Sequence, residues 1–285
     1  MDNHRALHGL LEKIDGNRTS LRERVKPQPV HQKKVDDYCR ILNTFTSNAI
    51  EGNSFTLLET KLWLDDGITV EGKTRNELFE VDGHGKAFDY MLDTARGTTL
   101  DGIGDRLLEI TSRLHKYFFE LISPKDAGVY RTCGIMIVGS DRTFPEPETV
   151  GEHMGRFREA FLEYKDRSHP VVLAAFAHLR LVLIHPFVDG NGRISRLLMN
   201  LVLVNQGYQI INFDIGTRKR YYEALKKIDA RETDCDEFFR LIAELELDAQ
   251  EKHMDAIGFR PGESEETAQE KGKPVRKPGS RPDRP

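Results

Sequence analysis

The stretch HPFVDGNGRISR, residues 185–196, decides how this 285-residue sequence folds. It lies between the two most apolar segments of the chain, and their composition predicts buried helices over residues 170–184 and 193–206. Pro170 suits the first turn of the earlier helix, and Gly207 is typical of the position just past the end of the later one. The sequence therefore predicts a loop held between two core helices.

The residue types in this loop suit a polyphosphate. Gly190 and Gly192 permit backbone conformations and close approaches that a Cβ would obstruct. They lie where a helix begins, so the unpaired N–H groups of its first turn form an anion site. Arg193 and Arg196 are three residues apart, share one side of that helix and could both clamp phosphates.

Two further side chains of the loop supply chemistry. Asp189 is a hard oxygen ligand of the kind that holds Mg²⁺ together with phosphate oxygens. A histidine side chain ordinarily titrates near neutrality, so we expect that His185 could serve as a general base. Taken singly, a His-Pro pair at a helix end and a Gly-Asn-Gly turn are ordinary helix punctuation. Their combination within twelve residues favours a nucleotide-phosphate site.

The rest of the chain is predicted to be mainly helical. Apolar residues recur at helical spacing in five other segments, which are residues 33–50, 76–95, 106–122, 221–228 and 235–253. A β-prone run with turn residues at its end, residues 134–141, predicts a small hairpin projecting from the helical body.

Composition and charge exclude several classes of protein. A formal net charge of -4 gives no global argument for binding nucleic acid or an anionic membrane. Three scattered cysteines are too few for a disulfide scaffold or a zinc cluster. No apolar run reaches the roughly 20 residues of a bilayer span, and no apolar signal segment follows the first residues. We therefore expect a cytoplasmic protein without nucleic-acid or membrane partners.

The loop matches the signature of the Fic family, His-Pro-Phe-x-Asp/Glu-Gly-Asn-Gly-Arg-x-x-Arg, at every defined position. Residues 128–131 also look like the start of the family's flap, and residues 221–225 resemble its C-terminal helix beside the adenine. The resemblance implies a mainly α Fic fold, a helical bundle with a small β-hairpin flap. It further implies a protein adenylyltransferase that uses ATP and Mg²⁺, modifies a Ser, Thr or Tyr hydroxyl, and releases pyrophosphate.

The same resemblance assigns roles to individual residues. His185 would deprotonate the target hydroxyl, Asp189 would hold Mg²⁺, and Arg193 and Arg196 would steady the β- and γ-phosphates. The signature glycine is present at position 192, and this favours adenylyl transfer over transfer of a terminal phosphate. The other residues expected along the ATP are Val138, Gly139, Ser140, Asp141, Gly190, Asn191, Ile194, Ser195, Tyr221, Tyr222 and Asp229.

The flap is expected over residues 135–144. In the family it pairs with an extended segment of the target protein through main-chain hydrogen bonds. Without the loop motif, an edge hairpin that binds no ligand would be an equally good interpretation. At residue 229 this chain has Asp where relatives often carry an Asn that contacts adenine, which makes the choice of base less certain than the handling of phosphate.

The segment SNAIEGN, residues 47–53, resembles the family's inhibitory pattern, Ser/Thr-x-x-x-Glu-Gly/Asn. Ser47 and Glu51 are four residues apart and share one helical face. By resemblance, Glu51 forms a salt bridge with Arg196 and keeps the γ-phosphate from its productive position. Without the resemblance, the segment is a helix that closes on Gly52 with a solvated carboxylate.

These patterns divide the chain into three regions. Residues 1–75 form an N-terminal helical region with the inhibitory helix, and residues 76–255 form the catalytic domain. Residues 256–285 are rich in proline and charge, and we expect a disordered tail, with a proline-rich docking arm as the alternative.

Two other functions stay open at this point. The same residues could remove AMP from a modified protein, with Glu51 positioning a water molecule. A nucleotide-binding regulatory module without turnover is a third interpretation, although intact His185 and Asp189 argue against it. Relatives of the inhibitory type often form homodimers, and the resemblance leaves a homodimer open.

Overall fold

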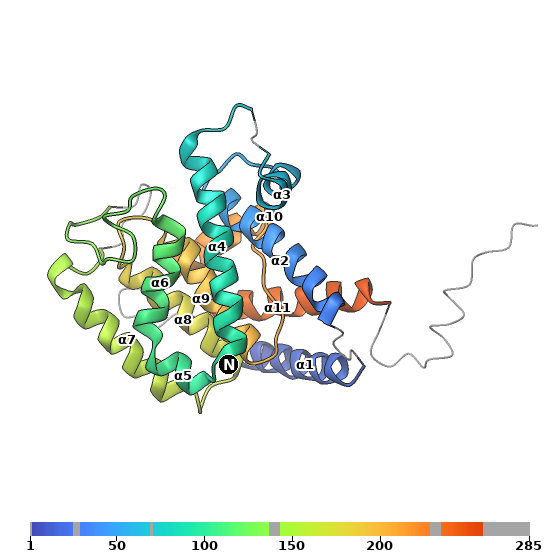
Figure 1. Cartoon of the computed structure of the whole chain (residues 1–285). Helices are drawn as coiled ribbons and strands as arrows, with labels where there is room; N and C mark the ends of the chain where they lie inside the picture. Colours follow the sequence, from blue (N-terminus) through green and yellow to red (C-terminus); the bar gives the residue numbers. More distant parts are fainter. Residues whose placement is uncertain (1, 25–28, 69–70, 137–142, 229–234, 259–285) are drawn as a thin grey trace, which may run out of the picture.

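The computed structural model describes residues 2–24, 29–68, 71–136, 143–228 and 235–258 (Figure 1). Within these ranges the chain is helical, and no strand is present. The helices in chain order are α1 (Asp2–Arg24), α2 (Pro29–Ile50), α3 (Leu57–Asp66), α4 (Arg75–Gly97), α5 (Leu100–Asp105), α6 (Leu107–Phe119), the 3-10 turn η1 (Pro147–Thr149), α7 (Val150–Tyr164), α8 (Pro170–Ile184), α9 (Asn191–Asn205), α10 (Ile215–Lys227) and α11 (Asp236–Ala256). The predicted mainly α class is confirmed.

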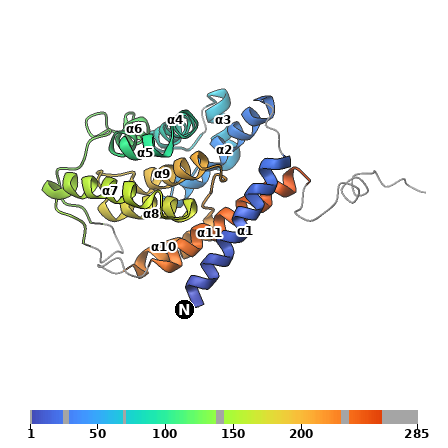
Figure 2. The same cartoon turned by 90° about the horizontal axis from the view of Figure 1, so that it is seen from below.

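Helices α8 and α9 form the centre of the bundle. Apolar residues surround α8 on nearly all sides, which is the pattern of a helix buried all round. The two helices pack on each other, and α4 and α6 cover α9 while α7 and α11 cover α8. In Figure 2, α4 to α6 lie on one side of this pair and α10, α11 and α1 on the other. The loop from 185 to 190 is thereby anchored at both ends in the core.

The N-terminal helices cover two separate faces of this core. Helix α1 lies along α11, and α2 packs on α4 with α3 beside both (Figures 1 and 2). Helices α3 and α4 each begin with a complete capping box, formed by Thr56 with Glu59 and by Thr74 with Glu77. These boxes fix the positions at which the chain turns after α2 and enters α4. The division of the chain at residue 75 stays a prediction.

The predicted hairpin and tail fall largely outside the described residues. Residues 134–136 and 143–144 carry no regular structure, and residues 137–142 between them lie outside the described ranges. The hairpin flap therefore stays a prediction, as does the disorder of residues 259–285. None of the described helices has the length and apolar content that crossing a bilayer requires.

Candidate active site

The turn between α8 and α9 is fixed by unusual backbone conformations and a buried amide. His185 closes α8 with a φ of 53°, the only positive φ among the described non-glycine residues. The Asn191 side chain accepts a hydrogen bond from the Phe187 N–H at 2.9 Å and donates one to the Phe187 carbonyl at 2.8 Å. Gly190 has a φ of 76°, and a Cβ there would lie 2.7 Å from the Phe118 ring. Only glycine fits this position.

The His185 imidazole is oriented with one nitrogen able to accept a proton. Its Nδ1 lies 3.3 Å from the Val182 carbonyl oxygen, which can only accept, so Nδ1 carries the hydrogen and Nε2 keeps its lone pair. Burial lowers the pKa of this imidazole to about 4, which leaves it neutral near pH 7. A neutral, oriented imidazole is the form that a general base requires.

Arg131 holds the backbone beneath that imidazole. The side chain is buried, and its Nε donates to the His185 carbonyl at 2.8 Å. Its backbone N–H donates to the Pro186 carbonyl at 2.8 Å, and its Nη1 donates to the Cys133 carbonyl at 3.0 Å. From the sequence Arg131 is expected only as part of the approach to the flap, because contacts with distant carbonyl groups leave no spacing pattern.

His115 of α6 supports the other side of the loop. Its ring stacks on Phe187 with centroids 3.8 Å apart and planes 1° from parallel. Nδ1 accepts from the Gly128 N–H at 2.9 Å, so Nε2 carries the hydrogen and donates to the Asp189 carbonyl at 3.2 Å. Burial lowers the pKa of His115 to about 4. The sequence patterns above do not include His115, although a histidine on the apolar stripe of an amphipathic helix is a usable signal.

Arg196 is bound by the end of α2. Its Nε donates to the Ser47 hydroxyl at 2.9 Å, and its Nη2 donates to the Ser47 carbonyl at 2.9 Å and to Glu51 Oε1 at 2.8 Å. The ion pair between Glu51 and Arg196 that the family resemblance implies is therefore present, with the arginine side chain 2% exposed. Burial acts to raise the pKa of Glu51, but the charges of Arg196 and Arg193 outweigh it and hold that pKa below its ordinary value.

Glu51 also lies against the N-terminus of α9. A Cβ built on Gly192 would lie 2.7 Å from Glu51 Oε1, so the absent side chain at this position admits the carboxylate. The Tyr222 hydroxyl donates to Glu51 Oε2 at 3.5 Å, and Arg218 Nε donates to the Ile50 carbonyl at 2.8 Å. A carboxylate thus lies beside the first turn of α9, where the sequence predicts an anion.

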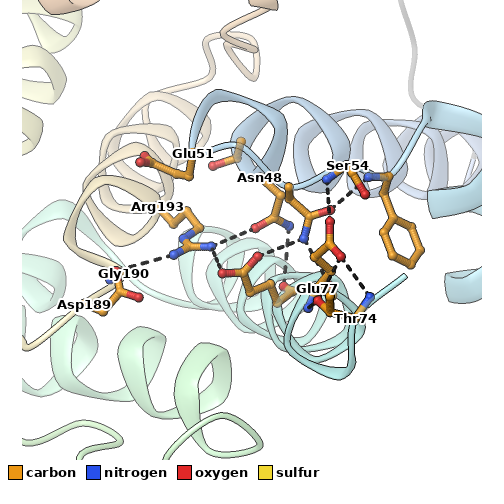
Figure 3. Close-up of polar contacts among 12 residues, drawn as sticks. Asn48, Glu51, Ser54, Thr74, Glu77, Asp189, Gly190 and Arg193 are labelled. Carbon is orange, nitrogen blue, oxygen red and sulfur yellow. Dashed lines mark hydrogen bonds and ion pairs between the residues drawn. The ribbon is translucent and has the colours of Figure 1, made fainter. Parts of the chain in front are cut away.

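Arg193 makes a second set of contacts (Figure 3). Its Nη1 lies 2.8 Å from Glu80 Oε1 and donates to Asn48 Oδ1 at 3.3 Å. Its Nη2 lies 3.6 Å from Asp189 Oδ1, and its guanidinium carbon lies 4.5 Å from the centre of the Phe118 ring. Neither Glu80 nor Asn48 was anticipated as a site residue. Each of the two signature arginines is thus nearly buried and paired with a carboxylate from a distant part of the chain, Arg193 with Glu80 of α4 and Arg196 with Glu51 in the turn after α2.

The site retains donors and an exposed carboxylate suited to a nucleotide with its metal. Arg193 Nε and Arg196 Nη1 are buried and have no hydrogen-bond partner among the described residues. The Asp189 side chain is 63% exposed. No group of three His, Cys, Asp or Glu residues that could hold a metal occurs in the described ranges. A single open carboxylate fits Mg²⁺, which takes one or two carboxylates and completes its shell with phosphate oxygens and water.

The remaining predicted ATP-binding residues divide into three groups. Ile194 and Ser195 are fully buried within α9, and the Ser195 hydroxyl donates to the Asn191 carbonyl at 2.7 Å. Tyr221 is also buried, with its hydroxyl 3.1 Å from His178 Nε2, whereas Tyr222 is only partly buried. The predicted residues outside the described ranges are Val138, Gly139, Ser140, Asp141 and Asp229.

Comparisons with known proteins agree on one family. Residues 105–203 match the Fic/DOC family. The chain is 34% identical over 236 residues to a Protein adenylyltransferase Fic of Nematostella vectensis, which covers 82% of this chain and 53% of that protein. A protein of the same name from Drosophila melanogaster is 34% identical over 252 residues, which covers 86% of this chain and 47% of that protein. The chain spans about half the length of these curated relatives.

Solved structures give the same fold. Fic-1 from C. elegans aligns with a TM-score of 0.75 at 25% sequence identity, covering 88% of this chain and 72% of that chain. A Fic domain-containing signaling protein from Bacteroides thetaiotaomicron aligns with a TM-score of 0.73 at 23% identity, covering 88% and 99% of the two chains. This second likeness bears on the fold alone.

Proposed function

The chain belongs to the Fic/DOC family, and on that premise we propose that it is a self-inhibited protein adenylyltransferase. It transfers AMP from ATP to a hydroxyl of a Ser, Thr or Tyr residue on a target protein. The observation that carries the proposal is the position of the Glu51 carboxylate, on Arg196 and at the N-terminus of α9. An inhibitory carboxylate and a phosphate compete for the same donors.

The proposed chemistry uses the loop residues in distinct roles. A target hydroxyl is a weak nucleophile near pH 7, and His185 Nε2 accepts its proton as the oxygen attacks the α-phosphorus. The bond from the α-phosphorus to the bridging oxygen breaks, and pyrophosphate leaves. N–H groups of Asn191 and Gly192 face the developing charge, whereas the Gly190 N–H donates to Asp189 Oδ1 at 2.6 Å. Mg²⁺, held by Asp189, would supply charge neutralisation at the α- and β-phosphates.

The target protein, the adenine and the two regions of the chain are assigned as follows. Residues 135–144 dock an extended segment of the target, and Tyr221, Tyr222 and Asp229 lie beside the adenine. Residues 1–75 act as the regulatory region, and residues 76–255 act as the catalytic one. The homodimer and the cytoplasmic location stay predictions, to be tested by light scattering and by microscopy of the tagged protein.

The test compares Glu51→Gly with the parent chain. We expect Glu51→Gly to raise transfer from α-labelled ATP, to a lysate protein or to the enzyme itself, by at least tenfold. The reason is that Arg196 and the α9 N-terminus then accept the triphosphate. The control is Glu51→Gly with His185→Ala, which should return the signal to background. Equal labelling by Glu51→Gly and the parent would exclude self-inhibition by Glu51.

A further inference from the structure

Glu80, in the second turn of α4, contacts two parts of the site that lie far apart in the sequence. Its Oε1 lies 2.8 Å from Arg193 Nη1. Its Oε2 accepts a hydrogen bond from Asn53 Nδ2 at 2.8 Å. Asn53 follows Glu51 by two residues, in the turn that closes α2. The two oxygens of one carboxylate thus hold the signature arginine and the inhibitory segment together.

Arg193 depends on Glu80 for charge compensation. The Arg193 side chain is 4% exposed, and a buried guanidinium without a counter-charge is strongly destabilising. Of the other carboxylates near it, Asp189 is farther away at 3.6 Å and largely exposed to solvent, and Glu51 forms its ion pair with Arg196. Stacking of Arg193 on Phe118 fixes the plane of the guanidinium but supplies no full negative charge. Glu80 is therefore its principal ionic partner.

The second contact fixes the turn after Glu51. Asn53 Nδ2 donates to the Glu77 carbonyl at 3.1 Å as well as to Glu80, and Asn53 Oδ1 accepts from the Phe55 N–H at 3.0 Å. One helical turn earlier, Glu77 accepts from the backbone N–H groups of Ser54 and Thr74, both at 2.9 Å (Figure 3). Glu77 and Glu80 hold the same turn, but only Glu80 contacts Arg193.

We propose that Glu80 is a positioning residue for nucleotide binding, because it sets Arg193 in the orientation that the phosphates meet. The inference rests on the proposed function. Glu51 lies at the end of α2 and can withdraw, whereas Glu80 lies within α4, which packs directly on α9. The pair between Glu80 and Arg193 therefore persists when Glu51 leaves. On activation Arg196 therefore loses its ion pair with Glu51, whereas Arg193 keeps its ion pair with Glu80.

The experiment uses the full chain with Glu51→Gly as the background. Glu80→Gln should raise the KM for ATP, and the Kd of a fluorescent ATP analogue, by about tenfold, with a smaller change in kcat. Glu80→Asp keeps the charge but cannot reach both partners, so its Kd should lie between those of the background and Glu80→Gln. The matched control is Glu77→Gln, which loosens the same turn without touching Arg193 and should keep Kd within about twofold.

Each outcome bears on the proposal. An unchanged Kd in Glu80→Gln, or an equal rise in Glu77→Gln, overturns it, the latter because loosening the turn would then explain the effect. Should Glu80→Gln not fold, Glu80→Asp decides: an unchanged Kd there contradicts the proposal, and a severalfold rise with an unchanged Tm supports it. Absence of AMP transfer by Glu51→Gly would count against the proposed function, whereas the binding measurements test Glu80 without any turnover.

Discussion

His185 combines a strained backbone with a side chain tuned by burial. A left-handed conformation at a non-glycine residue costs on the order of 1–3 kcal/mol and persists only where its surroundings impose it. Arg131 imposes it here through hydrogen bonds to the carbonyl groups of His185 and Pro186. The conformation aims Nδ1 at the Val182 carbonyl and leaves Nε2 with its lone pair. Backbone strain and the state of the imidazole are thus parts of one arrangement.

The lowered pKa of His185 predicts the pH profile of the proposed AMP transfer. Because burial sets that pKa at about 4, the base form prevails above pH 4 rather than above the usual value of about 6.5. In Glu51→Gly at saturating Mg²⁺, kcat/KM should stay nearly constant from pH 8 down to about 5 and fall below that. A loss of half the rate near pH 6.5 would contradict this prediction. An NMR titration of the His185 ring, assigned with His185→Ala, gives the midpoint without turnover.

At the scale of helices, the sequence predicted the centre of the fold better than its edges. Helices α8 and α9 were placed within two residues at each end, because they are continuously apolar and bounded by Pro170 and Gly207. Helices α1 and α3 lie in the predicted N-terminal helical region but have no predicted bounds, and α5 and α7 have no counterpart among the predicted segments. Helices α3 and α5 are short and α1 is polar, although the pair Thr56 and Glu59 gave a capping-box signal for α3. Helix α7 buries Val150, Met154, Phe157 and Phe161 at helical spacing, and this periodicity was a usable signal.

The residues of the candidate site were also predictable only in part. The loop residues are adjacent in sequence, so their spacing was enough to predict a phosphate site. Arg131, His115 and Glu80 reach the loop from other helices and connections more than 50 residues away. Their positions depend on how α4 and α6 pack on α9, which local spacing does not encode.

The start of α9 provides a test at this scale. Gly190→Ala adds a Cβ that meets the Phe118 ring at 2.7 Å, on a residue with a φ of 76°. We expect the free energy of unfolding to fall by about 2–4 kcal/mol, from left-handed strain together with overpacking. Gly155→Ala is the matched control, because that position lies inside α7 with nothing within 4 Å of an added Cβ. For Gly155→Ala we expect the free energy of unfolding, measured by urea denaturation, to rise by up to about 1 kcal/mol. Equal effects of the two substitutions would exclude a special requirement at residue 190.

At the scale of the whole molecule, a buried carboxyl group lies in α11 close to where α1 packs on that helix. Glu246 of α11 is fully buried, and its Oε1 accepts hydrogen bonds from the Gln209 N–H at 3.0 Å and from Gln250 Nε2 at 3.1 Å. The same Gln250 nitrogen donates to the Ile14 carbonyl of α1 at 3.1 Å. Burial raises the pKa of Glu246 to about 8, so the group is neutral near pH 7. One hydrogen-bonded link between the first helix and the last, through Gln250, therefore includes a protonated glutamic acid.

This arrangement makes the stability of the molecule depend on pH with a defined sign. The pKa of Glu246 is higher in the folded chain than the ordinary 4.5, so its contribution is complete below pH 4.5 and is lost as the pH rises toward 8. The loss is about 1.4 kcal/mol per pH unit within that window. Glu246→Gln keeps the shape without ionising, so its Tm relative to the parent should rise steadily from pH 5 to pH 8. Subtracting the parent removes the contributions of the buried histidines.

Glu251→Gln is the control, because Glu251 also joins α11 to α1, by an exposed ion pair with Lys13 at 2.8 Å. Its Tm difference should stay flat with pH, and a flat difference for Glu246→Gln as well would show that the buried carboxyl does not couple the closure of α1 to pH.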